Sequence, residues 1–259
     1  MSWRVTLKNV WQVHSTGYII RFVLIMTTLV ALILAFLSTG LKDIHQKNEA
    51  IYNKKAILGA IAKEAGMDMS TISDDDVLNI FNTNIKQLVV DAKGQEVSME
   101  DVEALGYIGG KAENVDMAKE IKKPESDRVF PVYIYDNNGD KTYILTVRGK
   151  GLWDEIWGNV AIEDDLNTIV GVAFDHKGET PGLGAEIKDN PEFYTQFAGK
   201  KIFTESGEYV SVDVVKGGAK DIVHEVDGIS GATITADGVA DMMYSGLNLY
   251  RPYLETVKK

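Results

Sequence analysis

The chain has 259 residues, of which 45% are hydrophobic and 25% are charged, the proportions of an ordinary globular protein. It contains no cysteine, which excludes disulfides, thiolate zinc sites and cysteine-bound iron–sulfur clusters within this chain. The net charge of −11 is unevenly spread, because seven basic and two acidic residues precede Ala56, and the strongly acidic remainder is a poor candidate for binding nucleic acid.

The first predicted element is a membrane-spanning helix over residues 22–41, preceded by an N-terminal segment, residues 1–21, which is cytoplasmic only if the domain after the helix faces outward. Twenty consecutive residues from Phe22 to Leu41 carry no charge. As a helix they would extend about 30 Å, the thickness of the hydrocarbon core of a bilayer. A cleaved signal peptide is the alternative, but the apolar run is long for one and no A-x-A-like cleavage site follows it. Three basic residues precede the run and four follow it closely, so charge does not define the orientation.

Residues 42–128 are predicted to form a helical juxtamembrane and variable region. A helix is expected from Lys42 to about Gly66, and a second, capped helix over STISDDDVLNIFNTNIKQLVV. A third is expected over MEDVEALGYIGG. No chemical motif is recognisable between Met67 and Arg128.

From residue 129 onward the pattern favours a sheet. Two alternating runs flank Asn138-Gly139, a strong hairpin signal, and NVAIEDDLNTIVGVAFDHKGE predicts a second pair of strands. YVSVDVVKG is expected to be a fifth strand, and PEFYTQFAG a short helix. A final helix begins near Thr235 and is bent or ended by Pro252. The predicted fold is therefore α+β: one transmembrane helix, then a soluble domain with a mainly antiparallel sheet flanked by helices, its functional part spanning residues 129–259.

The stretch DGISGATITADGV, immediately before this last helix, contains more small and hydroxyl residues than a turn requires. A helix N-terminus presents unpaired N–H groups that suit a phosphate. Gly231 and Ala232 would allow close approach of that phosphate, and the hydroxyls of Ser230, Thr233 and Thr235 would bond to it or be esterified by it. The alternative is that Ser230 or Thr233 only caps the helix.

Two further stretches accompany this motif in chain order, GKGLWDEIWG and HKGETPGLGAEI. With the apolar N-terminal run and D-x-x-S-G-A-T-x-T, they resemble the C subunits of sodium-translocating NADH:quinone oxidoreductases. The resemblance covers the predicted anchor and roughly residues 130–250, and the combination of motifs is specific.

The resemblance implies a flavoprotein in which a flavin transferase links FMN covalently, through its phosphate, to Thr233. Asp227, Ser230, Gly231 and Ala232 fit the recognition pattern of the transferase, and Thr235 is its last position. The resemblance also makes Glu179, Thr180 and Leu183 lining residues of the flavin pocket. It places Trp153 against the ring, with a buried structural tryptophan as the alternative.

By the same resemblance, the chain is an electron carrier within a respiratory enzyme that pumps sodium. It is implied to accept single electrons from a cluster elsewhere in the complex and to pass them to the flavin of the B-type partner. The A, B, D, E and F types of subunit are the implied partners, and they carry out NADH oxidation, quinone reduction and sodium transport. The resemblance places the protein in the inner membrane as a single-pass protein, with its flavin domain in the periplasm.

Three alternatives remain at this stage. The G subunit of the related Rnf complex also carries a threonine-linked FMN, but the GETPGLGAE loop and the chain length favour the quinone reductase. A membrane-anchored binding module without a cofactor is a candidate of another class. A serine hydrolase is disfavoured because G-I-S-G does not match G-x-S-x-G. No catalytic residue and no metal ligand set are predicted for this chain.

Overall fold

The computed structural model describes residues 16–137 and 139–258. Most of the predicted segment 1–21, and Asn138 of the predicted hairpin turn, lie outside the described residues. Contacts divide the chain into two units, residues 1–50 and 51–259, and each is described here by itself.

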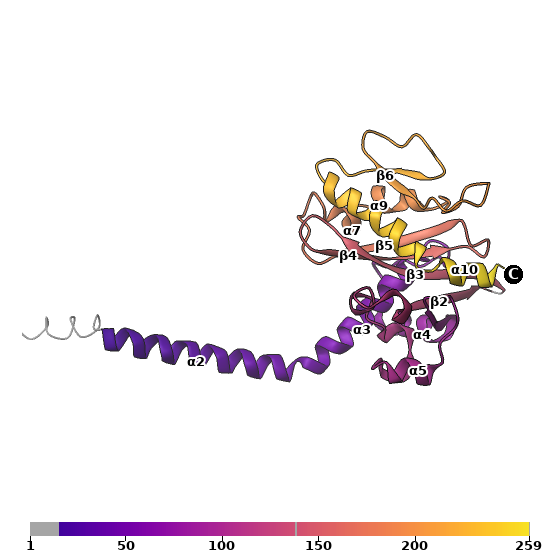
Figure 1. Ribbon diagram of the computed structural model, residues 1–259. Helices are drawn as coiled ribbons and strands as arrows, with labels where there is room; N and C mark the ends of the chain where they lie inside the picture. The colour runs from indigo at the N-terminus through magenta and orange to yellow at the C-terminus, as the bar shows by residue number, and fades with distance from the viewer. Residues whose placement is uncertain (1–15, 138, 259) are drawn as a thin grey trace, which may run out of the picture. The chain divides into compact units, whose positions relative to one another are not determined.

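The first unit contains a long apolar helix, α2 (Thr16–Gly40), followed by the start of α3 (Lys42–Gly59). Helix α2 has 25 residues and contains an 18-residue stretch with a mean hydropathy of 2.6, and none of its residues is buried within the protein (Figure 1). It begins before the charge-free run and therefore includes Arg21. By length and composition it is able to cross a membrane.

The second unit is built on a five-stranded antiparallel sheet in which the strands follow one another in chain order (Figure 1). Its strands are β1 (Ile85–Asp91), β2 (Val129–Asn137), β3 (Asp140–Lys150), β4 (Glu155–Ile162) and β5 (Ile169–His176). The α+β class, the mainly antiparallel sheet and the β2–β3 and β4–β5 pairs are confirmed.

Three predicted elements need correction. Helix α4 (Asp74–Asn84) is capped by Ser73 as expected but ends at Asn84, and the following IKQLVVD is β1. Its apolar residues pair with β2 (Leu88 lies opposite Val132), and this tertiary pairing overrides helical continuation. Helix α3 ends at Gly59 rather than near Gly66, because the chain there packs directly on β5.

The predicted fifth strand, YVSVDVVKG, does not join the main sheet. Ser211 has a φ of 62°, a left-handed conformation that interrupts an extended run. Only Asp213–Val215 remains as β6, which pairs in parallel with β7 (Glu225–Asp227) in a separate two-stranded sheet.

The two faces of the main sheet carry different cores, because successive side chains of a strand point to opposite faces. On one face Leu145, Val147 and Val160 pack against α9 (Thr233–Asn248). On the other, Ile144 and Ala161 belong to a cluster with the end of α3 and α4. Helix α10 (Arg251–Val257) follows α9 and has Pro252 in its first turn, so the predicted interruption at this proline is confirmed.

Short helices connect the remaining parts of the unit. Between β1 and β2 lie α5 (Met99–Ala104), η1 (Ile108–Gly110), η2 (Ala112–Asn114), α6 (Met117–Glu120) and η3 (Glu125–Asp127). After β5 come α7 (Glu186–Asp189), α8 (Pro191–Tyr194) and η4 (Thr195–Phe197), and the last two confirm the short helix expected in this stretch.

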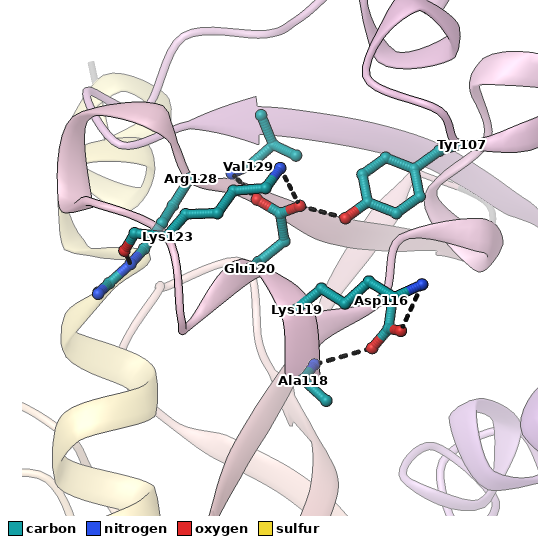
Figure 2. A network of polar contacts seen from close by, with 8 residues as sticks. All are labelled: Tyr107, Asp116, Ala118, Lys119, Glu120, Lys123, Arg128 and Val129. Atoms are coloured by element: carbon teal, nitrogen blue, oxygen red, sulfur yellow. Dashed lines mark hydrogen bonds and ion pairs between the residues drawn. The ribbon is translucent and has the colours of Figure 1, made fainter.

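A buried carboxylate fastens the β1–β2 connection to the sheet (Figure 2). Glu120 is fully buried and accepts hydrogen bonds from the Val129 N–H (2.9 Å), the Lys123 ammonium (2.6 Å) and the Tyr107 hydroxyl. Burial, together with the bond to Glu120, raises the pKa of the Tyr107 phenol well above its usual value. The segment between Met67 and Arg128, in which the sequence shows no chemical motif, therefore contains residues that are packed into this unit.

Candidate functional site

Three segments distant in sequence meet at a cleft of about 680 Å³. They are the turn after β3, the loop between β5 and α7, and the start of α9, and β6 with the turn after it forms a further wall. The lining residues are Leu152, Glu179, Thr180, Leu183, Gly184, Val214, Val215, Lys216, Gly217, Gly228, Ile229, Ser230, Gly231, Ala232, Thr233, Ile234, Thr235, Ala236 and Asp237. Eight of the ten residues named from sequence are among them, and Trp153 and Asp227 lie outside the lining.

The start of α9 is a helix terminus without a side-chain cap. The N-cap is Ala232, with φ −122° and ψ 39°, and it makes no capping hydrogen bond through its side chain. The hypothesis that Ser230 or Thr233 caps this helix is therefore wrong. Its first N–H groups face the cleft with the positive end of the helix dipole behind them.

Gly231 is required at this place for two reasons. Its φ of +80° is a conformation that side chains rarely adopt, and a Cβ here would lie 3.0 Å from Leu183 Cδ2. The absence of a side chain thus keeps open the passage between the Leu183 loop and the helix terminus.

The two threonines of the motif have opposite environments. Thr235 is 1% exposed, and its hydroxyl donates a 2.7 Å hydrogen bond to Glu179 Oε2. Thr233 is exposed at the first position of α9, in the cleft. A reagent that enters the cleft reaches the Thr233 oxygen, whereas the Thr235 oxygen is buried and already bonded.

Glu179 joins the three motifs beneath the cleft. It is 4% exposed, and its carboxylate accepts hydrogen bonds from the backbone N–H of Trp153 at 2.9 Å and from the hydroxyl of Thr235. Neighbouring glycines make this close arrangement possible: a Cβ at Gly151 would lie 2.6 Å from Glu179 Oε1, and one at Gly184 would lie 2.3 Å from Oε2. The sequence placed Glu179 in the cofactor pocket, and the structure adds that it also holds the pocket together.

Trp153 is not a buried structural tryptophan. It is 66% exposed, and its indole N–H donates to Thr180 Oγ1 at 3.1 Å. Nearby, the Lys177 ammonium lies 3.0 Å from Asp154, and the backbone bond from Glu155 together with Lys177 lowers the pKa of Asp154. The indole is thereby fixed at the rim of the cleft with much of its surface free.

Asp227 lies just outside the lining of the cleft, next to Gly228 in sequence and opposite Val215 in the two-stranded sheet. Its carboxylate accepts from the Ala219 N–H, and its own N–H donates to Gln196 Oε1 at 2.8 Å. The first bond closes the turn at Gly217 and Gly218, both of which have positive φ. Asp227 therefore shapes the wall that carries Lys216.

Eleven of the nineteen lining residues were not named from sequence, among them Lys216, Leu152 and Ile234. Among the described lining residues, Lys216 carries the positive charge, and the following Gly-Gly pair was the available signal. Leu152 and Ile234 are 47% and 58% exposed, and each adjoins a residue that was named. Over residues 16–137 and 139–258, no group of three acidic or histidine side chains is arranged to hold a metal ion.

Comparison with known proteins agrees with this geometry. A family model described as an FMN-binding domain matches residues 151–248, a range that contains the second and third motifs and all of the first except Gly149 and Lys150. The C subunit of the Na⁺-translocating NADH-quinone reductase of Neisseria meningitidis serogroup A is 37% identical over 251 residues, covering 91% of this chain and 92% of the relative. The protein of the same name from Pseudomonas aeruginosa is 32% identical over 84% of this chain and 89% of the relative.

Solved structures are similar as well. The crystal structure of the C subunit of the Na⁺-translocating NADH-quinone reductase from Parabacteroides distasonis superposes with a TM-score of 0.70 at 36% identity, covering 83% of this chain and 96% of that one. The structure of Shewanella oneidensis NqrC gives a TM-score of 0.62 at 27% identity, covering 80% of this chain and 98% of that one. The chain belongs to the family of C subunits of Na⁺-translocating NADH-quinone reductases.

Proposed function

We propose that this protein is the FMN-bearing electron-transfer subunit of a Na⁺-translocating NADH:quinone reductase, and that Thr233 Oγ1 is joined to the FMN phosphate as an ester. The observation that carries the proposal is the exposed Thr233 hydroxyl at an uncapped helix N-terminus, inside the cleft formed by all three motifs. Formation of the ester joins the Thr233 oxygen to the phosphorus of an FMN-containing phosphoanhydride donor. The hydroxyl proton is lost, the phosphoanhydride bond breaks, and the other phosphate of the donor leaves with the bonding electron pair. A flavin transferase is the catalyst.

The residues of the cleft fit FMN. A volume of about 680 Å³ lies within the range of cofactor pockets. The free N–H groups of α9 and the exposed Ser230 suit a phosphate, and Gly231 leaves the approach open. Lys216 adds a positive charge to the same cleft.

The preference for Thr233 over Thr235 rests on burial. Esterification of Thr235 would require its hydroxyl to leave Glu179 and a phosphate to enter a site that is 1% exposed. Burial of a phosphate beside a carboxylate that has no positive partner would be strongly unfavourable. Thr233 is exposed in the cleft, so a phosphate attached to it would not be buried beside Glu179.

The rim of the cleft supplies an apolar surface for the flavin ring. Leu183 is 42% exposed and faces Gly231, and Leu152 and Ile234 are exposed beside it. Trp153 is fixed by Thr180 and presents its free surface at the same rim. We assign these side chains to ring contact, and we assign Asp227 to shaping the site for recognition by the transferase.

Bound FMN supplies one-electron redox chemistry at a fixed position, and covalent attachment prevents its loss. The protein holds the phosphate, orients the ring and leaves one side of the cleft open to an electron-transfer partner. The chain would accept electrons from a cluster elsewhere in the complex and pass them to the flavin of the B-type partner. Oxidation of NADH, reduction of quinone and sodium transport would belong to the remaining subunits of the A, B, D, E and F types.

Helix α2 is the proposed single-pass anchor in the inner membrane. Its length and hydropathy support this role. Residues 1–21 would lie on the cytoplasmic side, residues 22–41 within the bilayer, and both the variable region (42–128) and the FMN-binding domain (129–259) in the periplasm.

The test uses the full chain, co-expressed with a flavin transferase and run on a denaturing gel. The wild-type band should fluoresce, because noncovalent flavin does not survive detergent and heat. Thr233→Ala should abolish the fluorescence, since the bridging oxygen is gone. Thr235→Ala is the matched control: it should retain attachment in the folded fraction, at a cost in stability of about 2 kcal/mol from the unpaired Glu179 oxygen.

Each alternative has its own outcome in this experiment. Loss of fluorescence in Thr235→Ala but not in Thr233→Ala would show that Thr235, and not Thr233, carries the ester. A wild-type band without fluorescence would favour the cofactor-free binding module. An FMN ester in a chain that copurifies with a ferredoxin:NAD oxidoreductase would favour the Rnf-type assignment.

A further inference from the structure

The loop that carries Glu179, Thr180 and Leu183 is closed at its base by an ion pair. The loop, residues 177–185, follows β5, which ends one residue after Asp175, and leads into α7, which contains Lys188. Lys188 Nζ lies 2.9 Å from Asp175 Oδ1, and the Asp175 residue is 6% exposed. Asp175 also accepts from the His176 N–H at 2.8 Å, which fixes the backbone where the loop begins.

A third side chain reaches this ion pair from a distant part of the sequence. The Tyr52 hydroxyl, on α3, donates to Asp175 Oδ2 and accepts from Lys188 Nζ at 2.6 Å. The same ammonium lies 5.2 Å from the centroid of the Tyr52 ring. Burial and the hydrogen bond to Asp175 raise the pKa of the Tyr52 phenol, so the hydroxyl keeps the proton that it donates.

The C-terminal end of α3, the helix that carries Tyr52, lies directly on β5. A Cβ at Gly171 would lie 2.6 Å from the Ala60 carbonyl oxygen, and one at Gly59 would lie 3.3 Å from Ala173 Cβ. Ile57 and Leu58 are buried in the core on this face of the sheet. Tyr52 therefore projects from a fixed element, and its hydroxyl is a fixed point for the loop.

We propose that Tyr52, Asp175 and Lys188 form a basal clamp that positions the loop between β5 and α7 (the cofactor loop, residues 177–185). Through this clamp, α3 contributes to the geometry of the flavin site. The loop is then held at two points, by Glu179 beneath the cleft and by the basal clamp at its base. The three are positioning residues, which act through Thr180 and Leu183 rather than by contact with the cofactor. The link to flavin geometry rests on the proposed function.

The clamp joins two distant parts of the second unit. Tyr52 lies at the start of the unit formed by residues 51–259, so the basal clamp connects the beginning of this unit to the cofactor loop. Fixing such a loop matters because small displacements of positioning groups alter reaction geometry strongly.

Hydrogen–deuterium exchange of the full-length protein in detergent tests the clamp directly. Tyr52→Phe keeps the ring and removes the hydroxyl, and Lys188→Met removes the ammonium. Each should accelerate exchange of the amides of residues 177–187 by about tenfold, as expected when a hydrogen bond to a charged group is lost. Lys188→Arg should restore the wild-type rate, and the double variant should be no faster than the faster single variant.

Matched controls separate the clamp from general effects of substitution. Tyr244→Phe removes a hydroxyl from a tyrosine that is 53% exposed on α9. Lys119→Met removes the exposed ion pair of Lys119 with Asp116, 3.2 Å apart (Figure 2). Neither should change exchange in residues 177–187. Unchanged exchange in both Tyr52→Phe and Lys188→Met, or additive effects in the double variant, would overturn the clamp.

A second readout reports on the cofactor. In the flavinylated protein, Tyr52→Phe and Lys188→Met should alter the visible circular dichroism of FMN and leave its amount unchanged, an effect that a loss of stability alone does not produce. Accelerated exchange without a change in this spectrum would overturn the link to flavin geometry. A wild-type chain without FMN would refute the proposed function, while the exchange experiment would still decide on the clamp.

Discussion

Thr233 and Thr235 lie two positions apart on one helix and differ in the accessibility of the hydroxyl oxygen. This property favours Thr233 for the proposed attachment of FMN. Thr235 is buried and bonded to Glu179, whereas Thr233 is exposed in the cleft. The difference follows from the helical period, because side chains two positions apart point to nearly opposite sides of an α-helix. Of the two threonines, the structure thus makes Thr235 a buried structural residue and leaves Thr233 as the proposed acceptor.

The prediction at this scale concerns Glu179. Glu179→Ala should lower the free energy of unfolding by about 3 kcal/mol, because the Trp153 N–H and the Thr235 hydroxyl both lose a buried partner. Glu179→Gln should cost much less, since the amide oxygen can accept from Trp153 while its NH₂ group donates to Thr235. Denaturant unfolding of the two variants measures the difference. Equal losses would show that charge, rather than hydrogen bonding, makes Glu179 necessary.

Conservative replacement of Thr233, the proposed site of FMN attachment, tests how its hydroxyl is presented. Thr233→Ser keeps the hydroxyl and removes the methyl group that restricts its rotamer. We expect a fluorescent band of reduced intensity on the denaturing gel, with unfolding unchanged because Thr233 is exposed. A band as strong as the wild type would show that the methyl group has no part in presenting the oxygen.

At the scale of elements, the site depends on the close approach of α9 to the end of β3. A Cβ at Gly238 would lie 2.3 Å from the Lys150 carbonyl oxygen, and one at Gly246 would lie 2.7 Å from Val147 Cβ. On the strand side, a Cβ at Gly149 would lie 2.7 Å from Met242 Cβ. These glycines bring the helix N-terminus level with the turn that carries Trp153.

Gly238→Ala is therefore expected to destabilise the protein, although alanine is the better helix former by about 1 kcal/mol. The added methyl group clashes with backbone, so α9 must shift, at a net cost of about 2 kcal/mol. The matched control is Gly178→Ala, which places its methyl group in open space in the cofactor loop. Thermal unfolding should separate the two variants. A gain of stability in Gly238→Ala would show that the helix has room to move.

At the scale of the whole molecule, the chain combines a long apolar helix with a soluble unit that contains the candidate site. Helix α2 has 25 residues, about 37 Å of helix, which exceeds the hydrocarbon thickness of about 30 Å. The excess allows a tilted span.

The first prediction at this scale is that the anchor is retained. The intact mass of the protein purified from its host should include residues before Phe22, and the protein should remain with membranes after carbonate washing. A mature chain that begins near Lys42 would refute the anchor, although the flavin site would be unaffected.

The second concerns the side of the membrane. In spheroplasts, protease added from outside should degrade the unit formed by residues 51–259, while a cytoplasmic marker protein stays intact. Protection of this unit until the cells are lysed would place the FMN-binding domain in the cytoplasm.

The sequence alone determined those features that depend on local patterns. Apolar length identified α2, and strand patterns identified β2 to β5. The three motifs together identified the family and eight of the nineteen residues that line the cleft. These predictions succeeded because residue type and spacing are sufficient for each of them. IKQLVVD and YVSVDVVKG were misassigned because their state depends on distant partners: a pairing with β2 in the first case and a left-handed Ser211 in the second.

Only the tertiary structure decided which hydroxyl is accessible and how the motifs are joined. Burial of Thr235, the bonds of Glu179 and the contacts of Tyr52 with Asp175 and Lys188 link residues 26 to 136 positions apart. No local pattern encodes such contacts, because they exist only once the sheet has brought the segments together. The sequence thus supplied the chemical groups of the site, and packing assigned each of them its role.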